Sequence, residues 1–225
     1  MTKENLNANL AQIQRIKSLA GSIAHETRNP LASIKQGCDI IKNCLDEAME
    51  FLDLISTSST RGLMISEMIL ANIREEKIDT NKFTDLSIAK IVKSAIREFA
   101  FESKKERDLV NVDLGNDFIF KGEETLMIFV LFNLLKNSLY YKAKINIWLD
   151  ADKKYLYFKD NGVGISADKL KLIFDDFFSS NKKGGTGLGL PFCKRVILSF
   201  GGDISCKSNV NEGVEFCLKF PAEQN

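Results

Sequence analysis

The single histidine of this 225-residue chain, His25, has neighbours that suit chemistry. Glu26 adjoins it, and Asn29 lies four residues on, which places Asn29 one turn away on the same face of a helix. Pro30 lacks an N–H and cannot bond the Glu26 carbonyl, so we expect the helix to bend just past the histidine. An imidazole has an ordinary pKa of about 6.5 and is largely neutral at cellular pH. His25 is therefore a competent nucleophile with a carboxylate beside it.

His25 and the cysteines also have simpler interpretations. A histidine on a helix is more often an ordinary surface residue. A zinc-protease HExxH motif is excluded, because position 29 is Asn and the chain has no second histidine. The cysteines form no CxxC pair and are odd in number, and a zinc site would also need more than one histidine. Their placement among apolar residues is typical of reduced, buried thiols in a cytosolic protein. They are Cys38, Cys44, Cys193, Cys206 and Cys217.

Three further blocks combine amide, acidic and glycine residues. Asn133 and Asn137 lie four apart in an apolar helical run and share one helix face. Residues 160–164 (DNGVG) directly follow a predicted strand. Residues 184–189 (GGTGLG) precede an apolar helix, an arrangement that presents backbone N–H groups to phosphate. Taken singly, these blocks are also explained as core amides, a turn and a loop, and the glycine spacing is not the dinucleotide-binding fingerprint.

Long helices are predicted to carry the first block, which is the segment around His25, Glu26 and Asn29. Apolar residues recur at helical spacing from about residue 10 to 45 and again from about 47 to 75, with a short charged turn between them. Two such helices predict an antiparallel hairpin that leaves an apolar stripe on each helix. A second copy would cover both stripes in a four-helix bundle, so we expect a homodimer.

A mixed domain is predicted to carry the other blocks. The polar stretch 78–83 (IDTNKF) predicts a linker, which gives expected domains of residues 1–78 and 79–225. In the second domain we expect helices at 85–101, at 123–141 and after 189, and strands at 109–114, 118–120, 144–149, 155–159, 203–208 and 213–220. This order of elements predicts an α+β two-layer sandwich with helices on one face of a sheet.

The charge and apolar patterns exclude several classes of partner. The chain has 31 basic and 30 acidic residues, so no overall field attracts nucleic acid or an anionic membrane. No apolar run approaches the length of a membrane span, and the polar start MTKENLNANL does not resemble a signal peptide. We expect a cytoplasmic chain, either on its own or as the cytoplasmic part of a membrane-bound protein.

Together, the four blocks resemble the phospho-acceptor, Asn and two glycine boxes of sensor histidine kinases of two-component systems. Residues 174–180 (FDDFFSS) resemble the family's phenylalanine box, and the resemblance runs from about residue 10 to 220. It implies a dimeric phospho-acceptor hairpin and an ATP-binding domain of the kind shared with gyrase, Hsp90 and MutL. It also implies ATP and Mg²⁺ as cofactors, and as partner a response-regulator receiver domain that is phosphorylated on aspartate.

The resemblance also implies a role for each matching residue. His25 would attack the γ-phosphate, Glu26 would accept its proton, and Asn29 stands where the family carries a residue for dephosphorylating the partner. Asn137 would bind Mg²⁺, and Asp160 would accept a hydrogen bond from the adenine amino group. The full set implied for ATP is Asn133, Asn137, Tyr141, Asp160, Gly162, Gly164, Lys182, Lys183, Gly185, Thr186, Gly187, Leu188 and Gly189.

The chain departs from the family pattern at two positions. Tyr140 stands where a basic residue often touches phosphate, and Lys136 or Lys142 would have to compensate for it. Glu123 replaces an aspartate at the start of the Asn-box helix. The run SIAHETRNPL is also similar to kinases of small-molecule quorum sensing.

Two competing functions remain. An ATPase of the gyrase and Hsp90 type, or a serine kinase of the anti-sigma-factor type, resembles this family but carries glutamate where Asn133 stands, and an amide cannot accept a proton as that base does. A catalytically inactive dimeric adaptor that only binds a receiver domain is the other alternative. An ATP-dependent label at His25 would separate them.

Overall fold

The computed structural model describes residues 27–38, 52, 55, 58–59, 62, 78–99, 101–178 and 187–221. The described residues up to 62 and those from 78 onward belong to different compact units. In the first unit, residues 27–38 form a helix and Gly62 also has helical backbone. A Cβ added at Gly62 would lie 3.7 Å from Cγ of Pro30, so these two positions are neighbours. His25 and Glu26 lie outside the described residues.

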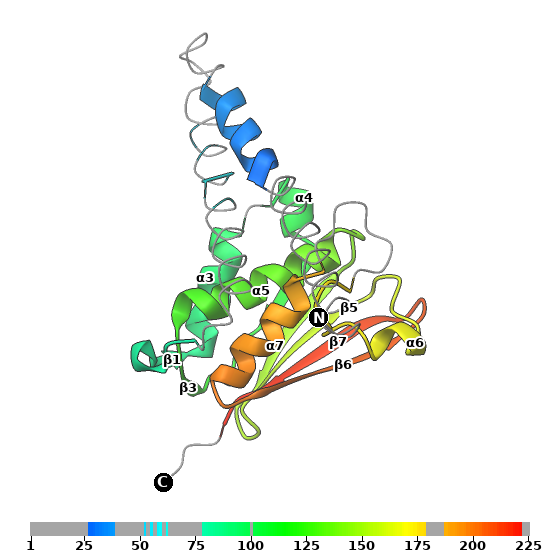
Figure 1. Cartoon of the computed structure of the whole chain (residues 1–225). Coiled ribbons are helices and arrows are strands. Elements are labelled where there is room, and N and C mark those ends of the chain that lie inside the picture. Colours follow the sequence, from blue (N-terminus) through cyan, green and yellow to red (C-terminus); the bar gives the residue numbers. More distant parts are fainter. Residues whose placement is uncertain are drawn as a thin grey trace, which may run out of the picture. The chain divides into compact units, whose positions relative to one another are not determined.

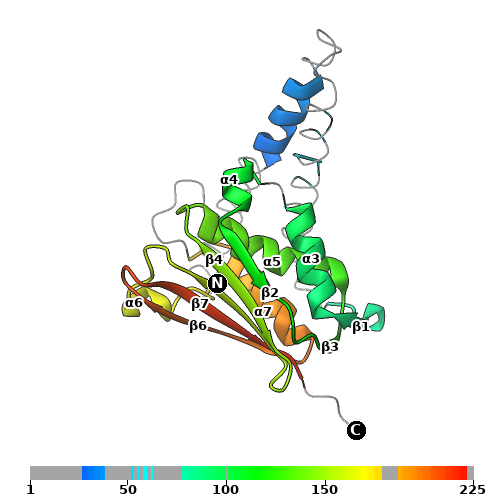
Figure 2. The same cartoon turned by 180° about the vertical axis from the view of Figure 1, so that it is seen from behind.

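The second unit is built on a five-stranded sheet with the strand order β2-β4-β5-β7-β6 (Figures 1 and 2). Its strands are β2 (Val110–Asp113), β4 (Ile145–Asp150), β5 (Tyr155–Asp160), β6 (Asp203–Asn209) and β7 (Gly213–Lys219). The β2–β4 pair is parallel, whereas the other three pairs are antiparallel. The parallel pair requires a crossover, which β3 and α5 supply.

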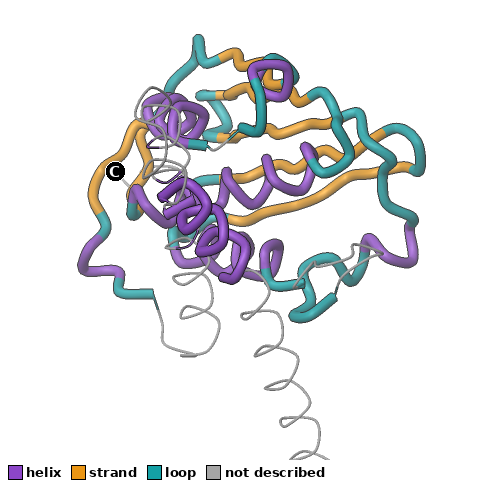
Figure 3. The backbone as a smooth tube through the Cα atoms, turned by 90° about the horizontal axis from the view of Figure 1, so that it is seen from above, coloured by secondary structure: helices purple, strands orange, loops and turns teal. Residues whose placement is uncertain are grey.

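Three helices cover one face of this sheet: α3 (Ile88–Glu98), α5 (Glu124–Leu139) and α7 (Gly189–Ser199) (Figure 3). Side chains alternate along the strands, and Ile145, Ile147 and Leu149 of β4 are buried while their neighbours are more exposed. Helix α5 is apolar on most of its circumference and is buried along its length, as expected of a helix with packed neighbours on several sides. The α+β two-layer sandwich predicted from the sequence is confirmed.

The start of the first predicted helix in this domain was wrong. Residues Thr84–Ser87 form strand β1, which pairs antiparallel with β3 (Ile119–Gly122) in a separate two-stranded sheet. Helix α3 begins only at Ile88 because the Ser87 hydroxyl caps it, accepting from the Lys90 N–H at 3.1 Å. Asp117 fixes the same cap by accepting from the Ser87 hydroxyl at 2.6 Å.

Three short elements were not predicted. They are the 3₁₀ turn η2 (Thr80–Lys82), inside the predicted linker, and the single-turn helices α4 (Lys104–Arg107) and α6 (Ala167–Leu170). Each is too short for an apolar periodicity to appear in the sequence. Across the part of the chain that the structure describes, no helix combines the length and apolarity needed to cross a bilayer.

Candidate functional site

The site centres on the carboxylate of Asp160, the last residue of β5, which is only 6 % exposed. Its Oδ1 accepts hydrogen bonds from the Gly162 N–H at 2.9 Å and from the Val214 N–H at 3.2 Å. Its Oδ2 accepts a bond from the Ser138 hydroxyl at 2.5 Å. Helix α5, the loop after β5 and strand β7 therefore converge on one buried acidic group.

A side chain is disfavoured at Gly162 and at Gly164, the two glycines that follow Asp160, for different physical reasons. At Gly162 an added Cβ would lie 3.1 Å from Asp160 Oδ1, so a side chain there would crowd the carboxylate. At Gly164, φ is +69° and an added Cβ would lie 1.9 Å from the carbonyl oxygen of Asn209. The resemblance implies a role for Gly164 in ATP binding, and the close approach to Asn209, the last residue of β6, gives a separate structural reason for a glycine at this position.

This close approach makes Gly164 the most sensitive glycine of the loop. We expect Gly164→Ala to lower the free energy of unfolding by more than about 2 kcal/mol, because both the positive φ and the contact with Asn209 disfavour a side chain. Urea denaturation of the two proteins measures the difference. Gly115→Ala is the matched control, since a Cβ there would meet only Asp113 Oδ1 at an ordinary 3.5 Å. Equal stability of the two variants would contradict the packing described here.

The two asparagines of α5 are placed differently although they share a face. Asn133 is 9 % exposed, and its Nδ2 donates to the Phe129 carbonyl at 2.9 Å, a bond typical of a satisfied core amide. Its Oδ1 faces the first residue of α7, because a Cβ on Gly189 would lie 2.7 Å from it. Asn137 is half-buried one turn further on and directly precedes Ser138.

The second glycine block meets the phenylalanine block. The Phe177 N–H donates to the Gly187 carbonyl at 3.1 Å, and a Cβ on Gly187, where φ is +67°, would lie 2.5 Å from the Phe177 carbonyl carbon. Leu188 is buried directly before α7. The remaining predicted residues of this block, Lys182, Lys183, Gly185 and Thr186, lie outside the described residues.

Three contributors to the site were missed by sequence reasoning. Ser138 and Val214 hold Asp160 from 22 and 54 residues away along the chain. Ser208 steadies the loop after β5, since its hydroxyl accepts from the Ile165 N–H at 2.8 Å and donates to the Gly213 carbonyl at 2.6 Å. A single sequence carries no signal for such distant pairs.

The segment that contains the Asp160 site matches a known protein family. Residues 122–224 match the protein family of histidine kinase-, DNA gyrase B- and HSP90-like ATPases. This segment belongs to that ATPase family. Every group placed around Asp160 lies within those limits, so the site is part of an ATP-binding domain.

Longer similarities extend to sensor kinases. The chain is 35 % identical over 227 residues to the Autoinducer 1 sensor kinase/phosphatase LuxN of Vibrio campbellii, which covers 95 % of this chain and 27 % of LuxN. It is 31 % identical over 228 residues to the CAI-1 autoinducer sensor kinase/phosphatase CqsS of Vibrio cholerae, covering 91 % of this chain and 33 % of CqsS. The chain thus spans a third or less of the length of these relatives. It is homologous to sensor histidine kinases.

The fold agrees with a solved relative. The catalytic domain of the histidine kinase ThkA superimposes with a TM-score of 0.52 at 26 % sequence identity, covering 62 % of this chain and 97 % of that domain. The ATPase domain described here is therefore a histidine-kinase catalytic domain in its fold.

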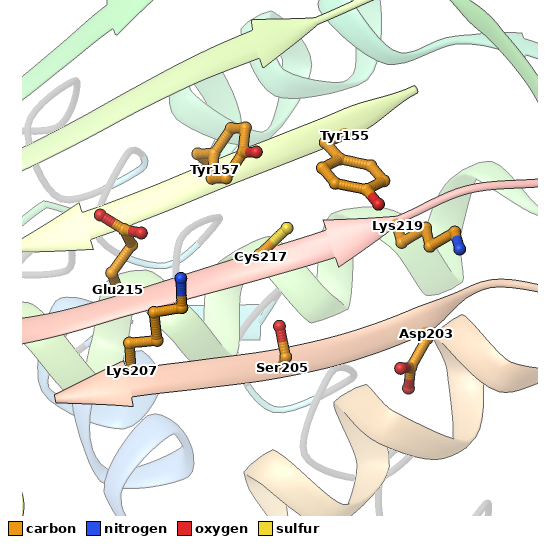
Figure 4. A pocket seen from close by; sticks show the side chains of 8 residues that line it. All are labelled: Tyr155, Tyr157, Asp203, Ser205, Lys207, Glu215, Cys217 and Lys219. Atoms are coloured by element: carbon orange, nitrogen blue, oxygen red, sulfur yellow. The ribbon is translucent and has the colours of Figure 1, made fainter. Parts of the chain in front are cut away.

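The opposite face of the ATPase-domain sheet carries a separate concavity of about 400 Å³ (Figure 4). Tyr155, Tyr157, Cys217 and Lys207 are among its lining side chains, which rise from β5, β6 and β7. The Tyr157 ring stacks on Trp148 with centroids 5.0 Å apart. Burial raises the pKa of the Tyr157 hydroxyl, so it stays protonated near neutral pH. Successive side chains of a strand point to opposite faces of the sheet. The residues that line this concavity therefore lie on the face opposite to the Asp160 site.

The described cysteines follow the expectation of reduced, buried thiols only in part. All four are free, but Cys38 is exposed, contrary to that expectation. Cys193 is buried, and burial raises the pKa of its thiol. Cys206 lies on the helix-facing side of β6, where burial, and secondly the charge of Asp160, raise its pKa to about 12. Cys193 and Cys206 therefore remain protonated thiols with little reactivity.

Proposed function

We propose that this chain is an autophosphorylating histidine kinase, which takes the γ-phosphoryl group of ATP onto His25 and passes it to an aspartate of a response-regulator receiver domain. The observation that supports it most is the buried, fully oriented carboxylate of Asp160 inside an ATP-binding domain. The similarity to kinases named as sensors supports the transfer to histidine.

The Asp160 site fits an adenine base. A carboxylate offers roughly four acceptor positions, and three of them are taken by Gly162, Val214 and Ser138. One position on Oδ2 is left for the exocyclic amino group of adenine. A Cβ on Gly162 would lie beside the other oxygen, Oδ1, so the glycine keeps that edge of the carboxylate open to a flat ring.

The phosphates would extend towards Asn137 and the start of α7. Among the described residues no three His, Cys, Asp or Glu side chains come together as a metal site. Mg²⁺ would therefore rely on the Asn137 amide oxygen, on phosphate oxygens and on water, which are the hard ligands that it prefers. Bound Mg²⁺ would neutralise charge on the transferring group. Gly187 and Gly189 would bring backbone N–H groups near the phosphates, and Lys182 and Lys183 would add charge.

The phosphoryl step uses the His25–Glu26 pair. One imidazole nitrogen of His25 would form the P–N bond while the bond from the γ-phosphorus to the oxygen of the ADP leaving group breaks. Glu26 would take the proton from the other ring nitrogen, which carries the developing positive charge. In the transfer to the receiver, a carboxylate oxygen of the aspartate would form an O–P bond as the P–N bond breaks, and the proton held by Glu26 would return to the ring and restore the neutral imidazole.

The phospho-acceptor segment, residues 1–78, is proposed to form a dimeric helical hairpin, followed by the catalytic domain at residues 79–225. The neighbouring positions Pro30 and Gly62 support two helical segments side by side. Leu31 and Leu52 are 64 % and 51 % exposed, and a second copy would cover such residues. In that arrangement the response regulator would approach the helix that carries His25 and Asn29.

Asn29 is proposed to act in dephosphorylation of the partner. It is exposed on helix 27–38, and its amide can orient a water molecule towards the acyl phosphate of the receiver but cannot be a nucleophile or proton acceptor. We expect Asn29→Ala to slow dephosphorylation at least tenfold while autophosphorylation stays within about threefold of the wild type.

Autophosphorylation is measured as incorporation of label from γ-labelled ATP into the chain, and dephosphorylation as loss of label from a phosphorylated receiver domain. The matched control is Gln36→Ala, an exposed amide two turns further along the same helix face. A parallel loss of both activities in Asn29→Ala would show that Asn29 is structural, and the phosphatase proposal would then fail.

The competing functions are separated by one experiment. Asn133 donates to the Phe129 carbonyl, so the position used by the glutamate base of related ATPases holds an amide engaged with the backbone. Incubation with γ-labelled ATP, Mg²⁺ and a panel of receiver domains is expected to label the chain first and a receiver afterwards. Release of labelled phosphate without labelled protein would indicate an ATPase, and absence of any turnover would indicate the inactive adaptor.

A further inference from the structure

We propose that Ser138 is a positioning residue for nucleotide recognition, which fixes the plane of the Asp160 carboxylate so that its free acceptor position meets the adenine amino group. This inference rests on the proposed function, in which Asp160 reads the base. Ser138 makes no contact with the base in the proposal and acts through Asp160.

The arrangement of donors around Asp160 carries the argument. The N–H groups of Gly162 and Val214 both bind the same oxygen, Oδ1. Bonds to one oxygen locate it but leave the carboxylate plane loosely defined, because the terminal torsion of an aspartate is intrinsically broad. The Ser138 hydroxyl binds the other oxygen, Oδ2, at 2.5 Å and so defines this torsion. Oδ2 is also the oxygen with an acceptor position to spare.

Ser138 is itself held rigidly. It is 3 % exposed near the end of α5, and its carbonyl accepts bonds from the N–H groups of Tyr141 at 3.1 Å and Ala143 at 3.3 Å. A serine inside a helix commonly turns its hydroxyl back to a carbonyl of its own helix. Here the hydroxyl bonds Asp160 instead, across to the sheet. The last turn of α5 thus presents a fixed donor to a group that would otherwise rotate.

The same helical turn would serve both ends of the nucleotide. Ser138 directly follows Asn137, the proposed Mg²⁺ ligand. A displacement of this turn would therefore move the base-reading carboxylate and the phosphate-binding amide together. Through Ser138, α5 would set the distance between the Asp160 carboxylate, which reads the base, and the Asn137 amide, which serves the phosphates. The loop after β5 binds only Oδ1, the oxygen that does not meet the base.

The test compares two nucleotides that differ in one amino group. Binding of ADP and of purine riboside diphosphate, which lacks the 6-amino group, is measured by titration calorimetry with Mg²⁺ on the full chain. We expect Ser138→Ala to bind ADP about tenfold more weakly, the scale of one hydrogen bond to a charged group. Binding of the purine analogue is expected to change by less than about twofold, because the analogue has no amino group to be misaligned.

Ser199→Ala provides the matched control. Its hydroxyl is also on a helix and bonds a carbonyl of that helix, Val196, at 2.7 Å, near the end of α7 that lies away from the glycine block. It should bind both nucleotides as the wild type does. If Ser138→Ala does not fold, Ser138→Cys keeps the volume with a weaker donor, and an ADP-selective loss of about threefold is expected from it.

The outcomes distinguish this inference from the function on which it rests. Wild-type protein that binds the two nucleotides equally would mean that Asp160 does not read the amino group, and both proposals would fall. A wild type that prefers ADP, with a Ser138→Ala variant that weakens both nucleotides equally or neither, would overturn the positioning role alone. Selective loss of ADP binding in the variant would support it.

Discussion

Asn137→Ala is expected to abolish the Mg²⁺ dependence of nucleotide use and to lower the rate of autophosphorylation by roughly a hundredfold or more. The amide oxygen is the only protein ligand that we propose for Mg²⁺, and loss of that ion would remove several kcal/mol of charge stabilisation in the transition state. Initial rates of label incorporation over a range of Mg²⁺ concentrations measure both effects.

Asn146→Ala is the control for Asn137, since Asn146 is an exposed amide of β4 that faces away from the helices. Its rate and Mg²⁺ dependence should match the wild type. An Asn137→Ala protein that labels itself at a normal rate would show that Asn137 has only a structural role.

Asp160→Asn is expected to weaken nucleotide binding by about ten- to a hundredfold, the scale of a buried hydrogen bond to a charged group. The amide oxygen can still accept from the Gly162 and Val214 N–H groups, which places the amide nitrogen where Oδ2 now stands. That nitrogen would oppose the amino group of adenine with a second donor. Titration calorimetry with ADP gives the change in Kd.

Asp150→Asn is the control for Asp160, because Asp150 ends the neighbouring strand β4 and pairs with Lys153 at 2.8 Å in an exposed position. It should leave the affinity unchanged. A loss of less than about threefold in Asp160→Asn would contradict the assignment of Asp160 to the base.

The parts of the fold that the sequence predicts are those with a long local pattern. The apolar run of α5 and the alternating hairpin of β4 and β5 were placed to within two residues. Strand β1 was not, because Thr84–Ser87 is four residues long and depends on pairing with β3, such as Leu86 with Phe120. A strand formed by a partner some 30 residues away has no signature in its own residues.

Residue types and spacing single out the blocks that contain Asp160 and Asn137, and the resemblance to sensor histidine kinases implies the roles proposed for them. The groups that support Asp160 could not be predicted from the sequence. The bonds that orient Asp160 come from Ser138 and Val214, which only the packing of α5 and β7 onto the sheet brings near it. The close approach of Gly164 to the Asn209 carbonyl likewise arises only in the folded chain. Exposed Cys38 shows likewise that apolar neighbours in sequence do not settle burial.

The most direct test of the central claim is the position and chemistry of the phosphoryl group after incubation with γ-labelled ATP and Mg²⁺. We expect one group per chain, labile in acid and stable in base, and absent from a His25→Gln variant that still binds ADP as the wild type does. The chain has no other histidine, so no second imidazole can take the label. Label that persists in His25→Gln, or that survives acid in the wild type, would contradict the account.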